Sequence, residues 1–372
     1  MSQIIASQLN VTQMANGQAM TVPVYTIKGS NNGPSVYIQA NIHGAEVQGN
    51  AVIYQLLEQF KQLDCYGDIT LVPLANPIGS NQKSGEFTLG RFDPITGANW
   101  NRGYHFNDAL PAQFAQANPD MAISEIVSQF RALIIDDLEQ QKIDAPYGVT
   151  TGQFLCAKLQ RMALEADIVL DLHTGPISSR HLYCPEYAKD SAVLFDIPHV
   201  LFIPQDFDGA LDEACFCPWW QLQQAYQQQG RSIEVAVAAF TLELGSQEWL
   251  CLEEAKRDSE SILSYLSHRG VVKPGLFTPK KMTRYGCDLK DYRTFYAPKS
   301  GLVEYLAPLG GQVKQGEPLV RMLRIDRYDH PDVIEVIKAP DDCIAILHFA
   351  SASVNQGTEL YKLFTNYFTL SA

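Results

Sequence analysis

Two histidines and a glutamate have the types and spacing of metal ligands. His43 and Glu46 lie three residues apart, and His173 follows far downstream in the segment 171–175. Two imidazoles and one carboxylate form a ligand set suited to a catalytic zinc, with a fourth position open for water. A turn that opens a helix can aim His43 and Glu46 at one ion, while another strand supplies His173. The sequence therefore predicts an active site, provided that the three side chains converge.

Both ligand segments follow apolar, β-prone runs. Residues 35–42 indicate a largely buried strand that ends just before His43, and residues 46–62 show apolar side chains at helical spacing. Residues 167–172 indicate a second short strand that ends immediately before His173. Because ligands of open α/β sheets bind beyond the carboxyl ends of the strands, both histidines hold positions typical of a site.

A fourth candidate, Glu243, lies at the end of the apolar run 235–244. Ionised carboxylates are rarely buried without a partner, so a metal-bound water facing Glu243 would explain its position. Taken singly, a histidine at a strand end is more often hydrogen-bonded or exposed, and a strand glutamate more often pairs with an arginine. Four such residues at or just beyond the carboxyl ends of strands in one α/β domain favour a metal site. The sequence lacks the His-Glu-x-x-His motif of zincin proteases, so Glu46 is interpreted as a ligand and not as the base.

A polar loop carries a second group of candidate functional residues. Residues 90–102 are rich in turn formers and include Arg91, Asn101 and Arg102. The planar fork of arginine binds a carboxylate bidentately, and an adjacent asparagine can add a donor. The alternative is that both arginines make ordinary surface salt bridges, each worth about 0–1 kcal/mol.

These motifs resemble the succinylglutamate desuccinylase and aspartoacylase family. His-Gly-x-Glu at 43–46, Asn-Arg at 101–102, Asp-Leu-His-Thr at 171–174 and Glu-Leu-Gly at 243–245 follow one another in the family's order. The resemblance covers residues 34–247. It implies a zinc amidohydrolase related in fold to the zinc carboxypeptidases, which cleaves the amide bond of a small N-acyl amino acid.

The resemblance also implies a role for each residue. The ligands of the zinc, one Zn²⁺ per chain, would be three residues: His43, Glu46 and His173. Glu243 would be the general acid/base that takes a proton from the attacking water and returns it to the departing amine. Asn101 and Arg102 would anchor the free carboxylate of the substrate, and Arg91 would polarise the scissile carbonyl.

Two other functions stay open. A metallocarboxypeptidase that acts on peptide C-termini needs the same zinc, the same glutamate and the same carboxylate anchor. A non-catalytic zinc-binding scaffold, in which the C-terminal part of the chain does the work, is the third interpretation. The presence of Glu243 beside a full ligand set argues against the scaffold.

Composition excludes several classes of partner. The 372 residues are 46% hydrophobic and 19% charged, which is ordinary for a folded protein, and the length indicates two domains. The net charge of −13 argues against a nucleic-acid partner. No run approaches the ~20 apolar residues that span a bilayer, and the first residues lack a secretion signal. We therefore expect a cytoplasmic protein with no membrane partner and reduced cysteines, and a homo-oligomer is compatible with the sequence.

The last part of the chain contains an internal repeat. Ala-Pro recurs at 297–298 and 339–340, and Val-x-x-Gly-x-x-Leu recurs at 313–319 and 354–360. Short β-prone runs divided by proline and glycine turns predict two interleaved halves of a small sandwich or barrel. The pattern is similar to the biotinyl/lipoyl carrier fold, but Lys338 does not match the position of the modified lysine. We expect an unmodified accessory domain.

Helical segments alternate with the predicted strands. Residues 122–138 and 154–165 are amphipathic at a period of 3.6, and Asn16-Gly17 predicts an N-terminal hairpin. The predicted fold class is α/β, a mixed sheet flanked by helices as in the zinc carboxypeptidases, with a smaller C-terminal all-β domain. We place a zinc amidohydrolase catalytic domain at 1–286 and the β-sandwich or barrel domain at 287–372.

Overall fold

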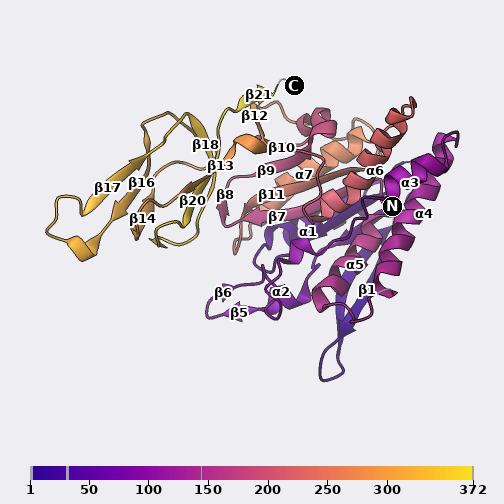
Figure 1. Cartoon of the computed structure of the whole chain (residues 1–372), viewed down its shortest axis with the longest axis horizontal. Coiled ribbons are helices and arrows are strands. Elements are labelled where there is room, and N and C mark those ends of the chain that lie inside the picture. The colour runs from indigo at the N-terminus through magenta and orange to yellow at the C-terminus, as the bar shows by residue number, and fades with distance from the viewer. Residues whose placement is uncertain (1–2, 31–32, 144, 371–372) are drawn as a thin grey trace.

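The computed structural model describes residues 3–30, 33–143 and 145–370. A large mixed sheet lies at its centre with helices on both faces, and an all-β region extends from one end of this body (Figure 1). The predicted fold class is confirmed.

The described residues form a central sheet of ten strands. In spatial order these are β1 (Ile4–Gln13), β2 (Ala19–Ile27), β4 (Ile69–Val72), β3 (Val36–Ala40), β7 (Ile168–Gly175), β11 (Ala238–Ser246), β9 (His181–Pro185), β10 (His199–Ile203), β12 (Arg284–Asp288) and β21 (Phe368–Leu370). The strands β4, β3, β7 and β11 run parallel in the middle. The predicted N-terminal hairpin is confirmed, because β1 and β2 pair antiparallel around a turn in which Gly17 adopts a φ of 84°.

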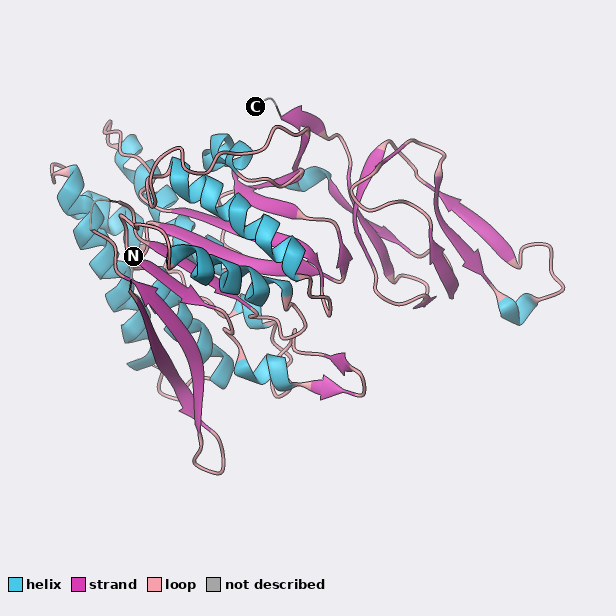
Figure 2. Cartoon of the chain, turned by 180° about the vertical axis from the view of Figure 1, so that it is seen from behind, coloured by secondary structure: helices cyan, strands magenta, loops and turns pink. Residues whose placement is uncertain are grey.

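Helices cover both faces of this sheet (Figure 2). On one face lie α1 (Gln48–Phe60) and α7 (Leu252–His268), and on the other lie α3 (Leu110–Ala117), α4 (Ile123–Ile143), α5 (Thr151–Ala163) and α6 (Leu211–Gln228). All five residues of β3 are buried, because side chains from both faces of this strand meet a helical layer. Ile38 and Ala40 pack beneath α1, whereas Tyr37 belongs to the core on the opposite face. None of the described helices is long and apolar enough to cross a bilayer.

Two strands end later in the chain than the sequence pattern predicted. The predicted strand 167–172 ends before His173, whereas β7 continues to Gly175, and β11 continues to Ser246. Each strand is prolonged because its parallel neighbour supplies hydrogen bonds, which a hydrophobic pattern does not encode. The register places His173 opposite Glu243, and it shifts immediately after this pair. The two side chains therefore lie next to each other at the carboxyl ends of their strands.

The all-β region consists of two sheets that share one core. One contains β13 (Tyr292–Tyr296), β20 (Glu359–Phe364), β18 (Cys343–His348), β15 (Gln312–Val313) and β8 (Ile177–Ser178); the other contains β17 (Ile334–Lys338), β16 (Pro318–Leu323), β14 (Gly301–Tyr305) and β19 (Ser353–Val354). The repeat appears as two interleaved halves. Gly357 N donates to Ala297 O at 2.9 Å, and Gly316 N donates to Ala339 O at the same distance.

Short elements complete the description. They are α2 (Pro77–Asn81), the hairpin of β5 (Lys83–Ser84) and β6 (Phe87–Thr88), and the 3₁₀ helices η1 (Trp100–Arg102), η2 (Glu186–Leu194), η3 (Leu289–Asp291) and η4 (Ile325–Arg327).

The all-β region is tied to the central sheet by backbone pairing. The strand β18 pairs with β8, which directly follows β7, and the last strand, β21, returns to pair with β12. Ser179 N also donates to Ile346 O at 2.9 Å. The domain boundary at residues 286 and 287 stays a prediction, because the chain crosses between the two parts more than once.

A buried histidine lies at this junction. His181 on β9 is fully buried, and its Nδ1 lies 3.0 Å from Ser179 O, to which it can donate. Burial lowers the pKa of His181 to about 4, and the nearby His199 and Lys362 act in the same direction. The folded protein therefore holds this imidazole neutral at a pH where the unfolded chain already protonates it.

We expect the junction to be acid-sensitive. Between pH 6.5 and pH 4 the unfolded state binds the His181 proton and the folded state does not, so stability falls as the pH drops through this window. The loss amounts to about 3 kcal/mol. Urea unfolding of the wild type and of His181→Asn, which keeps a donor near Ser179, measures it. Identical pH profiles for the two proteins over this window would contradict the assignment.

Candidate active site

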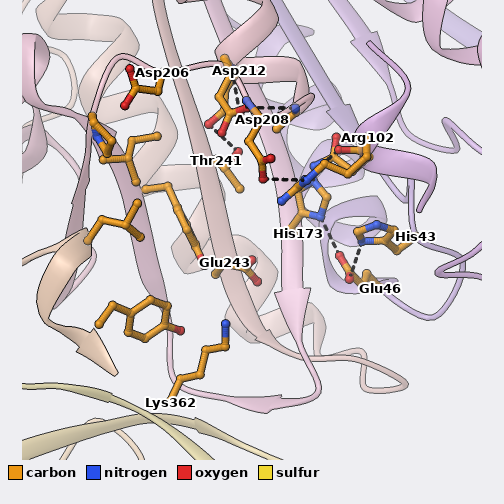
Figure 3. A pocket seen from close by; sticks show the side chains of 18 of the residues that line it. His43, Glu46, Arg102, His173, Asp206, Asp208, Asp212, Thr241, Glu243 and Lys362 are labelled. Carbon is orange, nitrogen blue, oxygen red and sulfur yellow. Dashed lines mark hydrogen bonds and ion pairs between the residues drawn. The ribbon is translucent and has the colours of Figure 1, made fainter. Parts of the chain in front are cut away.

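The three predicted metal ligands converge in one buried place. His43 Nδ1 lies 2.8 Å from Glu46 Oε1, and His173 Nδ1 lies 2.9 Å from Glu46 Oε2 (Figure 3). One ligand atom from each residue lies within 4.8 Å of the other two, and all three side chains are buried. This group could hold a metal ion.

The loop between β3 and α1 is shaped to present His43 and Glu46. Asn41 adopts a φ of 67°, and its Nδ2 donates to the carbonyl oxygens of His43 at 3.0 Å and Gly44 at 3.1 Å. Gly44 lies against the backbone of Gly79, so a Cβ at this position would overlap the Gly79 carbonyl. This close approach explains the glycine in the motif His-Gly-x-Glu.

Contacts behind the imidazoles fix their orientation. His43 Nε2 lies 2.8 Å from Asn99 Oδ1, and His173 Nε2 lies 2.9 Å from Asp171 Oδ2. These contacts hold the two rings so that both Nδ1 atoms face the same carboxylate. Metal-binding histidines are typically oriented in this way by a polar group on the side of the ring away from the metal.

The charges in this group are interdependent. Burial by itself would raise the pKa of Glu46, but the charges and hydrogen bonds of His43 and His173 outweigh it and hold this pKa well below its usual range. Burial would lower the pKa of His173, but Asp171 and Glu46 outweigh it and raise this pKa. Two imidazole nitrogens that face an ionised carboxylate require positive charge between them. Protons on the rings can supply it, and so can a divalent cation, so this donor set fits a metal.

Glu243 reaches the same cavity from the neighbouring strand. The cavity has a volume of about 470 Å³ and is lined by both Glu243 and the three candidate ligands. Burial, reinforced by the charge of Glu46, raises the pKa of Glu243 to about 7, although His173 and Arg91 lower it. No donor among the described residues reaches its buried Oε2. The carboxylate is therefore able to exchange a proton near neutral pH.

The polar loop contributes the remaining predicted residues. Arg91 Nη1 lies 3.3 Å from Glu46 Oε1, and this side chain is half exposed. Asn101 is buried on η1, with its Nδ2 3.3 Å from His173 Nε2. Arg102 donates to Asn101 O at 2.8 Å and lies 3.4 Å from Asp208 Oδ2. Neither arginine is a distant surface residue, because both line the cavity.

All seven residues singled out in the sequence line this one cavity: His43, Glu46, Arg91, Asn101, Arg102, His173 and Glu243. The sequence reasoning missed the supporting residues Asn99 and Asp171. Asp171 could have been found, because it precedes His173 by two residues in one strand and so shares its face.

The cavity also has a wall that no local pattern predicted. Tyr292 on β13 and Lys362 on β20 belong to the all-β region and line the cavity together with Tyr183 of the central sheet. Lys362 Nζ lies 5.3 Å from the centre of the Tyr292 ring. Tyr292 and Lys362 are more than 100 positions from His173, so only the tertiary fold brings them to the site.

Comparison with known proteins agrees with this geometry. Residues 32–269 match the model of the succinylglutamate desuccinylase/aspartoacylase catalytic domain. The chain is 24% identical over 353 residues to the N-alpha-acetyl-L-2,4-diaminobutyric acid deacetylase of Halomonas elongata, which covers 91% of this chain and 84% of the relative.

Two solved structures are similar over nearly the whole chain. A protein of Shewanella frigidimarina described as a succinylglutamate desuccinylase/aspartoacylase has a TM-score of 0.96 and 54% identity, covering 99% of both chains. A protein of the same family from Shewanella amazonensis has a TM-score of 0.95 and 53% identity, covering 98% of this chain and 100% of the other. With its catalytic-domain match and the converging residues described above, the chain belongs to the succinylglutamate desuccinylase/aspartoacylase family.

Proposed function

We propose that this protein is a zinc-dependent amidohydrolase that removes the acyl group from a small N-acyl amino acid. The observation that carries the proposal is the convergence of His43, Glu46 and His173 in one cavity with Glu243. The family match and the deacetylase relative support the same class of reaction.

The proposed zinc ligands are His43 Nδ1, His173 Nδ1 and the carboxylate of Glu46. Nitrogen and oxygen donors of this kind suit zinc, and three protein ligands leave a position for a reactant. A zinc ion held there would acidify water and polarise an amide carbonyl. The side chains of Asn99 and Asp171 keep the two imidazoles aimed at that point.

Glu243 is the proposed general acid/base. Its carboxylate accepts a proton from the water whose oxygen attacks the carbonyl carbon, and it delivers that proton to the amide nitrogen as the carbon–nitrogen bond breaks. The products are a carboxylate and a free amino acid. Its pKa of about 7 suits both halves of this exchange, because the ionised and protonated forms are then close in free energy near neutral pH.

The arginines are proposed to bind the substrate. Arg91, beside Glu46, can donate to the scissile carbonyl oxygen as negative charge develops there, and one such donor is worth about 3–4 kcal/mol. Arg102 and Asn101 bind the amino-acid moiety, so that binding energy remote from the reaction orients the amide bond.

The substitution Glu243→Gln should abolish turnover and leave the zinc site intact. Loss of a general acid/base lowers kcat by about 10²–10⁴-fold, and the amide is nearly isosteric with the carboxyl group. Metal analysis and steady-state kinetics measure the two properties. Glu253→Gln on α7, an exposed residue outside the cavity, makes the same change of charge and is the control. Substantial residual hydrolysis by Glu243→Gln would refute the role.

Asp171→Asn should weaken zinc binding. The asparagine keeps the size of the side chain but removes the charge that supports His173, and loss of such a supporting contact typically lowers metal affinity about 10–100-fold. Competition with a chromophoric chelator measures the affinity directly. An unchanged zinc affinity would show that Asp171 does not position the ligand.

A substrate panel on the zinc-loaded protein tests the function itself. The panel contains N-acetyl- and N-succinyl-amino acids beside short peptides, and release of the free amino group is followed. We expect hydrolysis of acyl amino acids that a chelator abolishes and added zinc restores. Cleavage of peptides alone would favour a carboxypeptidase, and stoichiometric zinc without turnover would favour the scaffold. Either result would overturn the proposal.

A further inference from the structure

The cavity is electrostatically polarised. In Figure 3, Lys362 lies near Glu243 at one end, and the carboxylates of Asp206, Asp208 and Asp212 lie at the other. The candidate metal ligands lie along the side between these ends. A molecule that fills the cavity therefore meets a strongly acidic surface at one end.

The acidic surface comes from one short segment. The loop after β10 and the first turn of α6 supply the four carboxylates of what we call the acidic rim: Asp206, Asp208, Asp212 and Glu213. Within the described ranges, Asp208 is the one rim carboxylate that forms an ion pair, with Arg102 at 3.4 Å. The positive charge available to the rim is therefore smaller than its negative charge.

Asp212 shows this imbalance most clearly. Its side chain is 3% exposed, and it accepts from Thr241 Oγ1 at 2.9 Å and from Glu213 N at 3.0 Å, both neutral donors. Burial, with the charges of Glu213 and Asp171, raises the pKa of Asp212 to about 7. A carboxylate buried without a cation is costly, and a bound cation would remove much of that cost.

Only Glu213, of the four rim carboxylates, is explained by a role in holding the loop in shape. Glu213 Oε2 accepts from Asp208 N at 2.7 Å and from Ala210 N at 3.1 Å, so it holds the loop in shape. Asp212 accepts from Glu213 N in the first turn of α6, and the side chains of Asp206 and Asp208 form no hydrogen bond to the described backbone of the loop. Asp206 and Asp208 are exposed side chains that nevertheless line the cavity.

A buried side-chain oxygen beside the rim also lacks a hydrogen-bond donor among the described residues. Asn101, adjacent to Arg102, is 6% exposed and lines the same cavity. No donor in the described part of the chain reaches its Oδ1. A buried amide oxygen without a partner is uncommon in a folded protein, and a ligand that carries N–H groups would satisfy it.

We infer that the substrate is the N-acyl derivative of a basic amino acid, whose amine or guanidine side chain binds to the acidic rim. This inference rests on the proposed amidohydrolase function. Arg102 contacts Asp208 of the rim, so the α-carboxylate and the cationic side chain of one amino acid bind side by side. The acyl group then extends toward Tyr183 and Tyr292. A neutral side chain leaves the rim uncompensated, and an acidic one is repelled.

Binding of product amino acids tests the inference without relying on turnover. Calorimetry on the zinc-loaded protein compares L-ornithine, L-lysine and L-arginine with L-norleucine, which matches ornithine in length without its charge, and with L-glutamate. We expect at least one basic amino acid to bind about tenfold or more tightly than norleucine, and glutamate to bind weakest. Equal or tighter binding of norleucine or glutamate would overturn the inference.

Charge-removing variants locate the selectivity. The double substitution Asp206→Asn with Asp208→Asn should reduce the preference for the basic amino acid over norleucine about tenfold. Both residues are exposed, so folding is not at risk. Asp190→Asn, an exposed residue outside the cavity, is the control and should leave this preference unchanged. If the preference survives the double substitution, the selectivity lies elsewhere, and the role assigned to the acidic rim is contradicted.

Hydrolysis of matched substrates separates failure of the inference from failure of the proposed function. Faster hydrolysis of N-acetyl-ornithine or N-acetyl-lysine than of N-acetyl-norleucine supports both. If N-acetyl-norleucine and N-acetyl-glutamate are hydrolysed as fast as the basic substrates, the substrate class is refuted but the amidohydrolase function is kept. Selective binding of basic amino acids without hydrolysis of any acyl derivative would refute the amidohydrolase and keep the cation-binding rim.

Discussion

The placement of one buried carboxylate between two imidazoles governs the architecture of this site. Glu46 faces His43 and His173 at hydrogen-bonding distance and all three side chains are buried, so the three charges must balance one another. This balance needs each ring to be held rigidly, and Asn99 and Asp171 do so from behind. A site of this kind tolerates little displacement, because charge compensation in a low dielectric depends steeply on distance.

The central sheet provides the rigidity. His173 and Glu243 lie opposite each other on two parallel strands, and Glu46 follows the neighbouring strand β3. Both faces of these strands are covered by helices, so their side-chain positions are fixed by two packed cores. The all-β region adds a wall to the cavity through Tyr292 and Lys362, and it is bound to the sheet by strand pairing on either side. Its position beside the site gives the region a direct part in shaping the cavity.

The sequence identified most of the candidate site residues but not the residues that surround them. Residue type and short spacing identified His43 and Glu46, and apolar runs located His173 and Glu243 near strand ends. The carboxyl ends of β7 and β11 were predicted too early, because the two strands extend each other there by pairing. Lys362 carried no local signal, and the acidic residues after β10 are common surface types whose convergence on one cavity depends on a loop conformation set by Glu213.

By itself, the sequence determined the residue types of the candidate metal ligands and of the proposed general base, the α/β class and the internal repeat of the C-terminal region, because these depend on side-chain chemistry and on periodicity along the chain. Only the tertiary structure decided which atoms of Glu46 face each histidine, how the two ends of the cavity differ in charge, and which residues of the all-β region reach it. The physical reason is that those features arise from strand register and from packing between segments far apart in the chain, which no local pattern of residues specifies.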